Sequence, residues 1–88
     1  MKIKKGFELI KRDGQNIVAA KKGSGVTADN HIVLSETASF LWNLLSENDV
    51  TKAEMLEGLL NNFNISNVLA LGDIYIFIRT MKENGIIE

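Results

Sequence analysis

The sequence predicts an α+β fold with a winged helix-turn-helix-like arrangement, in which a three-stranded antiparallel sheet is followed by three helices. Three observations predict this order. Two short runs with apolar content flank an Asp-Gly dipeptide, a β-branched run follows the next loop, and the later segments have helical periodicity and capping residues. With 88 residues and no long linker rich in Pro, Gly or Ser, the chain is expected to form a single domain over residues 1–88.

The three predicted strands come first. Residues 7–12 and 15–20 are joined by Asp13-Gly14, a dipeptide that accepts the positive φ angles of a type I′ turn, and together they predict a β-hairpin. The segment 21–28 has no periodicity and contains two glycines, which indicates a loop. Residues 31–34 have strand length and β-branched side chains, so they form the predicted third strand.

Capping residues mark the three predicted helices. Ser35 is suited to be the N-cap of the first helix, because its side-chain oxygen can accept an amide hydrogen of the first turn. Thr51 and Glu54 have the spacing of a capping box, which predicts the start of the second helix. The third helix is expected over about residues 66–84, with Ser66 as its candidate N-cap. Gly85-Ile86 then predicts a Schellman motif with glycine in the left-handed C′ position.

The third helix has an unusually wide apolar surface. At about 100° per residue, a core-facing stripe consists of Ala70, Ile74, Phe77 and Met81. The apolar arc continues around about half of the helix through Ile78, Leu71, Tyr75 and Val68. A surface helix usually needs a narrower stripe, so the margin of this arc is expected either to fill a three-layer core or to line a groove. Leu69 and Ile76 lie outside the arc and suggest a second contact patch.

Composition and charge limit the setting. The absence of cysteine excludes disulfides and thiolate sites and suits a reducing compartment, so the cytoplasm is expected. No segment has the roughly 20 apolar residues of a membrane span, and no signal peptide is indicated. Residues 1–22 hold seven Lys/Arg and two acidic residues, whereas residues 23–88 hold three and nine. The basic part is either ordinary solvated surface or an electrostatic guide for an acidic peptide.

No residue pattern indicates catalysis, a metal site or a cofactor. The sole histidine, His31, lacks the Asp/Glu spacing of a metal site and the partners of a catalytic triad. The glycines at positions 23 and 25 lack the context of a phosphate-binding loop. The chain is therefore not expected to be an enzyme. Nucleic-acid binding is also disfavoured, because only Arg79 and Lys82 are basic along the third helix; a winged-helix DNA-binding regulator stays the alternative function.

Most of the chain resembles the PqqD family. Residues 32–45 have the sequence IVLSETASFLWNLL, which is similar to the family pattern of a strand that ends in Leu-Asn-Glu-Thr before an aliphatic or Trp-containing helix. Ser35 replaces the usual Asn. Residues 73–88 resemble the closing helix of the family, with its Asp, spaced apolar residues and Gly-Ile-Ile ending, and residues 51–63 match more loosely.

This resemblance implies a RiPP recognition element, a non-catalytic winged module that captures the leader segment of a ribosomally made precursor peptide for a partner enzyme. In PqqD itself the partner is a radical SAM enzyme and the product is pyrroloquinoline quinone, whereas similar modules serve other peptide products. The expected partners are a precursor peptide and a radical SAM or other peptide-modifying enzyme, with no nucleic acid and no membrane. A homodimer stays open.

An exposed edge strand offers unpaired amide and carbonyl groups to which an extended peptide can bind as a further strand. We expect the third strand to be this edge, with the peptide bound along His31, Ile32, Val33 and Leu34. The margin of the third helix is expected to lie beside it and to accept apolar side chains at Leu71, Tyr75 and Ile78. Whether Ile32 with Leu34 or His31 with Val33 faces the peptide is left open.

Overall fold

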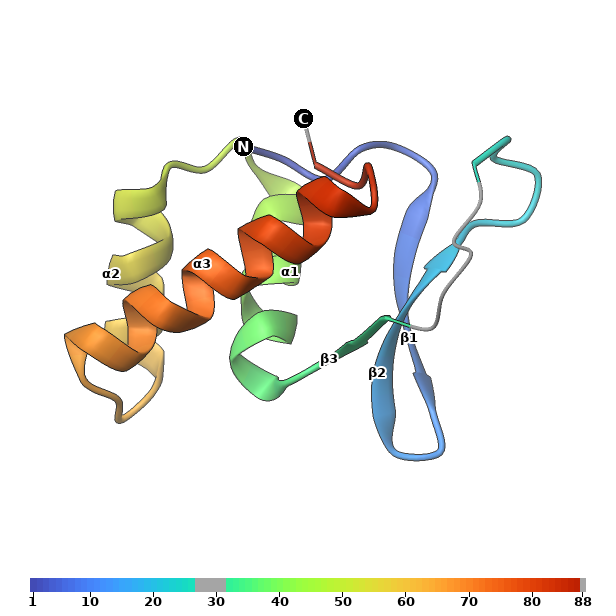
Figure 1. Cartoon of the computed structure of the whole chain (residues 1–88). Coiled ribbons are helices and arrows are strands. Elements are labelled where there is room, and N and C mark those ends of the chain that lie inside the picture. Colours follow the sequence, from blue (N-terminus) through green and yellow to red (C-terminus); the bar gives the residue numbers. More distant parts are fainter. Residues whose placement is uncertain (27–31, 88) are drawn as a thin grey trace.

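The computed structural model describes residues 1–26 and 32–87 (Figure 1). Three strands are followed by three helices: β1 (Phe7–Arg12), β2 (Gln15–Ala20), β3 (Ile32–Leu34), α1 (Glu36–Glu47), α2 (Lys52–Asn62) and α3 (Asn67–Glu83). The predicted α+β fold is confirmed. His31, which was predicted to open the third strand, lies outside the described residues.

The sheet has the order β1-β2-β3 with antiparallel pairing throughout. Asp13 and Gly14 have φ angles of 54° and 77°, so both central residues of the hairpin turn have the positive φ of a type I′ turn, as predicted. The register is continuous along both ladders, and it places Leu9, Val18 and Ile32 in one cross-strand row. This row lies on the face of the sheet that packs toward the helices.

Each helix begins at the predicted cap. The side chain of Ser35 accepts a hydrogen bond from the amide of Ala38, and that of Ser66 accepts one from the third residue of α3. The Thr51–Glu54 capping box has both of its hydrogen bonds. The amide groups in the first turn of a helix have no acceptor within the helix. These hydrogen bonds give some of them an acceptor.

The end of α3 is a Schellman motif. Gly85 has a φ of 67°, and its amide donates to the carbonyl of Lys82 at 3.1 Å. The amide of Ile86 donates to the carbonyl of Met81 at 2.9 Å. This is the paired hydrogen-bond pattern of the motif, and it turns the chain back so that Ile86 is buried in the core.

The helices lie to one side of the sheet (Figure 1), with α1 next to β3 and α2 farthest from the strands, packed against α1 and α3. Their shared core includes side chains with almost no exposed surface: Leu41, Leu45, Met55, Leu59 and Met81. Burial of each such side chain contributes about 1.5–3 kcal/mol. The N-terminal segment is held against this unit by a bridge between Ile3 and Ile87, and α3 packs across both α1 and α2.

Candidate functional site

The candidate site begins at the free side of β3. This strand pairs with β2 on one side, and no strand among residues 1–26 and 32–87 pairs with its other side. The prediction that the third strand is a sheet edge is therefore confirmed for its described part, Ile32–Leu34.

The hairpin determines which backbone groups of β2 face β3. The bond that closes the two-residue turn joins the carbonyl of Arg12 to the amide of Gln15. Hydrogen-bonded and non-hydrogen-bonded pairs alternate along an antiparallel ladder. Since the register has no interruption, Gln15, Ile17 and Ala19 direct their amide and carbonyl groups toward β1. Asn16 and Val18 therefore direct theirs toward β3.

The same alternation identifies the free backbone groups of β3. Leu34 lies opposite Asn16 and Ile32 lies opposite Val18, so both of these β3 residues bond to β2. Val33, between them, directs its amide and carbonyl away from β2. Its side chain is also accessible, with half of its surface exposed. Val33 thus provides one donor and one acceptor to any strand that is added at this edge.

A groove of about 270 Å³ runs along this free edge. One wall consists of residues from β3 and the start of α1: Ile32, Val33, Leu34, Ser35, Thr37 and Ala38. The other wall consists of residues of α3: Asp73, Ile76, Phe77, Thr80 and Met81. We call this the β3–α3 groove. Its walls are mainly apolar, so it suits the apolar side chains of an extended segment.

One end of the β3–α3 groove is joined by polar contacts. The hydroxyl of Thr37, in the first turn of α1, donates to the Oδ2 atom of Asp73 at 3.0 Å. The hydroxyl oxygens of Ser35 and Thr37 lie 3.2 Å apart, within hydrogen-bond distance. Asp73 is the sole ionisable side chain among the described residues that line the groove. These contacts connect the end of β3 to α3 and fix the width of the groove at this end.

The predicted helix residues do not lie in this groove. Leu71, Tyr75 and Ile78 line a separate groove on the side of α3 that faces α2, together with Lys52. The expectation that they lie beside the third strand is wrong, because the phase of the helix places them on the opposite side from Ile76. Ile76, which was assigned to a second contact patch, is the exposed apolar residue that α3 presents to β3.

Sequence reasoning also gave no role to several polar residues of the β3–α3 groove, namely Asp73, Thr80 and, on α1, Thr37. A usable signal was present. Asp73, Ile76 and Thr80 are spaced at i, i+3 and i+7, which defines one stripe along a helix. The mixed polarity of the stripe concealed it, because apolar periodicity is the pattern that identifies a helix face from sequence.

Among the described residues that line the groove, Asp73 is accompanied by no histidine, cysteine or second carboxylate. Over residues 1–26 and 32–87, no three His, Cys, Asp or Glu side chains are arranged to hold a metal ion. The pKa of Asp49 is lowered by a hydrogen bond from the N-terminal ammonium, and that of Arg79 is raised by its hydrogen bond to Glu83. Both groups are exposed and outside the β3–α3 groove.

In the described part of the chain, no helix has the length and apolar character to cross a membrane.

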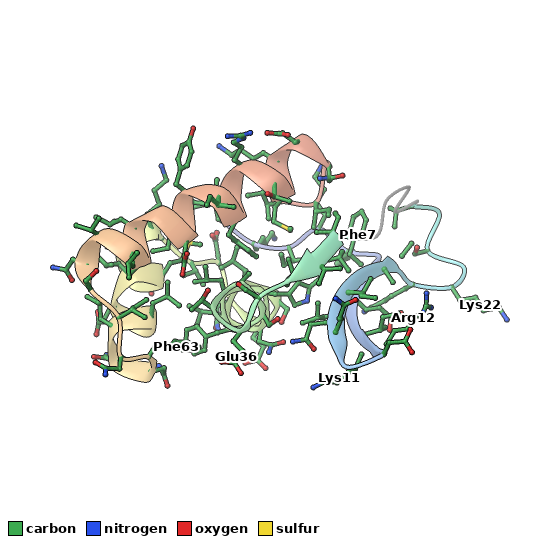
Figure 2. The ribbon with its side chains drawn as sticks, turned by 60° about the horizontal axis from the view of Figure 1, so that its bottom comes forward. Phe7, Lys11, Arg12, Lys22, Glu36 and Phe63 are labelled. Carbon is green, nitrogen blue, oxygen red and sulfur yellow. The ribbon has the colours of Figure 1, made fainter. Side chains whose placement is uncertain are left out.

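The basic residues of the hairpin are also remote from α3. Figure 2 shows Lys11 near the hairpin turn and Lys22 beyond the end of β2, both pointing away from α3, and Arg12 is exposed as well. The first turns of α3 expose apolar residues, with Val68 79% and Leu69 62% accessible. A DNA-recognition helix requires polar and basic residues there. The DNA-binding alternative is therefore not supported.

The fold and this edge-and-helix geometry define a winged-helix-like module with an open strand beside a helix. The chain belongs to the PqqD family: the sequence profile described as "Coenzyme PQQ synthesis protein D (PqqD)" matches residues 24–87. No curated protein matches the chain significantly.

Two solved structures have the same fold. A structure of TbiB1 in complex with the TbiA(beta) leader peptide has a TM-score of 0.71 at 17% identity, over 100% of this chain and 95% of that one. A structure of lasso peptide synthetase B1 complexed with the leader peptide has a TM-score of 0.67 at 16% identity, over 97% of this chain and 93% of that one.

Proposed function

We propose that this chain is a non-catalytic recognition module that binds the leader segment of a ribosomally made precursor peptide and presents it to a peptide-modifying enzyme. The observation that carries this function is that the backbone amide and carbonyl of Val33 point away from β2, beside an apolar groove. Membership of the PqqD family supports it. The two structurally similar proteins, which were solved with leader peptides, support it as well.

The geometry of β3 specifies how a peptide would lie. An added antiparallel strand places one of its residues opposite Val33, and the two residues exchange both hydrogen bonds. The side chain of that peptide residue lies on the same sheet face as Val33, away from the helices. The residues before and after it point to the other face, toward Ile76 and Phe77. The peptide should therefore carry two apolar residues separated by one position.

The direction of the peptide follows from the same pairing. Because β3 runs from Ile32 toward Leu34, the N-terminal part of an antiparallel peptide lies near Leu34 and Asp73. Its C-terminal part leaves the groove near Ile32. The bound part would thus be the middle of the leader. The segment that follows it would remain free to reach the enzyme.

The partner enzyme is proposed to be a radical SAM enzyme or another peptide-modifying enzyme. The cytoplasm is the proposed place of action, because ribosomal precursor peptides are made there and the chain contains no cysteine that would need protection or oxidation. The module supplies binding and orientation, and the reacting groups would come from the enzyme.

A display selection tests the function. Peptides that bind the full chain are selected from a random library, and a selected peptide is titrated into ¹⁵N-labelled protein. We expect a consensus with apolar residues two positions apart, saturable binding, and the largest amide shifts at Val33 and along the groove wall of α3. Binding should change little with salt, unlike DNA binding, which releases counterions. This function would be contradicted if the enriched peptides changed the amide chemical shifts of neither β3 nor the groove wall of α3.

A further inference from the structure

The side of α3 opposite the peptide groove carries a second apolar surface. It is a groove of about 400 Å³, which we call the α2–α3 groove. Ile74 and Ile78 form its buried floor, and Leu71 and Tyr75 remain 53% and 65% exposed. Val68, at the start of the same helical stripe, is 79% exposed. Val68, Leu71, Tyr75 and Ile78 are spaced at i, i+3, i+7 and i+10, which gives one continuous apolar strip along α3.

The α2–α3 groove has a cationic rim. Three basic residues lie at its rim: Lys52, the first residue of α2, and Arg79 and Lys82 of α3. Glu83 supplies the single carboxylate among the described lining residues. The Nε atom of Arg79 donates to Oε1 of Glu83 at 2.8 Å, so the carboxylate is already paired. No carboxylate within residues 1–26 and 32–87 pairs with Lys52 or Lys82. Two positive charges are therefore available at the rim of an apolar surface.

We infer that the α2–α3 groove is the docking site for an amphipathic helix of the modifying enzyme that carries acidic residues along its margins. An apolar groove between two helices accepts the apolar face of a third helix, with anchors at i, i+3 or i+4, and i+7. Acidic side chains beside those anchors would pair with Lys52 and Lys82. The identity of the partner as a modifying enzyme rests on the proposed function; the chemistry of the occupant rests on the groove itself.

Two other occupants fit less well. An extended peptide would find no strand edge at the α2–α3 groove, since the described lining residues come from α3 and from the first residue of α2. Its backbone groups would stay unpaired, whereas a helix satisfies its own. A second copy of the chain in a two-fold dimer would bring two cationic rims together, each with Lys52 and Lys82 beside a single carboxylate, Glu83, that already pairs with Arg79. That like-charge contact opposes self-association and favours a partner of opposite charge.

The consequence is a bridging role for α3. The leader peptide would lie on its β3 side and the enzyme on its α2 side, so that both can bind at the same time. Neither would displace the other, because Ile76 and Tyr75 are presented in different directions on the helix.

A pair of designed helical peptides tests this site on the full chain. Both have leucines at i, i+4 and i+7; one carries glutamates beside them and the other lysines. By fluorescence anisotropy, the glutamate peptide should bind at least about tenfold more tightly than the lysine peptide. Tyr75→Asp should abolish this binding, and Ile76→Asp, in the other groove, should leave it unchanged. The double variant Lys52→Glu/Lys82→Glu, at two exposed positions, should reverse the preference between the two peptides.

Several outcomes would overturn this docking site. Equal affinity for the two peptides, no binding of either, or loss of binding in Ile76→Asp would each do so. A dimer in sedimentation velocity that becomes a monomer in Tyr75→Asp would identify a second copy as the occupant instead. Circular dichroism checks that the variants are folded, and the charge-reversal variant decides the question if Tyr75→Asp does not fold. Selected leader-like peptides report on Val33 separately, so the two functions can fail independently.

Discussion

The sheet has two outer strands, β1 and β3, and they differ in what lies beside them. Both have a free side in the described part of the chain. β1 is the longer, with six residues, but it carries Glu8, Lys11 and Arg12, and charged side chains of this kind discourage strand addition. Lys11 and Arg12 are both exposed, and Figure 2 shows Lys11 pointing away from the body of the molecule. β3 has three apolar residues, and α3 stands beside it across a groove.

This difference shows that unpaired backbone groups alone do not make a peptide-binding site. Both edges offer amide and carbonyl groups, but β3 alone among the described strands combines them with the apolar wall of a helix. The hydrogen bonds can fix the register of a peptide, and the helix wall adds the burial of its side chains. The predictions below test each part of this combination.

The largest effect is expected from Ile76→Asp, which places a carboxylate in the apolar wall opposite β3. Binding of a selected peptide would cover this charge without a partner, so the affinity should fall about 100-fold. Leu69→Asp is the matched control, because Leu69 is on the same helix, has the same 62% exposure and does not line the groove. Isothermal titration of both variants measures the difference, and equal losses would show that the wall opposite β3 has no special part.

An intermediate effect is expected from Val33→Pro, which removes the outward amide of β3 without removing a bond to β2. Loss of this hydrogen bond should weaken peptide binding about tenfold. Lys11→Pro is the equivalent change on β1, since the amide of Lys11 also points away from β2, and it should leave the affinity unchanged. Circular dichroism accompanies both titrations. If Lys11→Pro weakened peptide binding and Val33→Pro did not, the binding site would be the β1 edge and not the β3 edge.

The smallest effect is expected from Thr37→Ala, which removes the hydrogen bond between α1 and Asp73 at one end of the groove. A hydrogen bond of this kind contributes about 1 kcal/mol, so peptide affinity should fall by a factor of about five or less. Thr37→Ser keeps the hydroxyl, so its peptide affinity should equal that of the wild-type chain. Thr37→Ala should also lower the free energy of unfolding by about 1 kcal/mol. If thermal unfolding shows this loss while peptide affinity stays at the wild-type value, peptide binding does not depend on the hydrogen bond to Asp73.

Much of the molecule could be predicted from short-range patterns. Asp13-Gly14 predicted the hairpin turn, and Ser35, Thr51 and Ser66 predicted the helix starts, because each acts on backbone groups within a few residues of itself. The Schellman motif at the end of α3 is local in the same sense. The resemblance to PqqD was confirmed by the family match over residues 24–87.

The sequence by itself thus determined the order of elements, the edge position of the third strand and the wide apolar surface of α3. Only the tertiary structure decided which side of α3 faces β3. That choice depends on how α3 crosses α1 and α2, and hence on contacts between distant residues such as Thr37 and Asp73, which are 36 positions apart. Helical periodicity identifies the residues that share a side, but it does not say what lies opposite them. For this reason Ile76, and not Tyr75, forms the wall beside Val33.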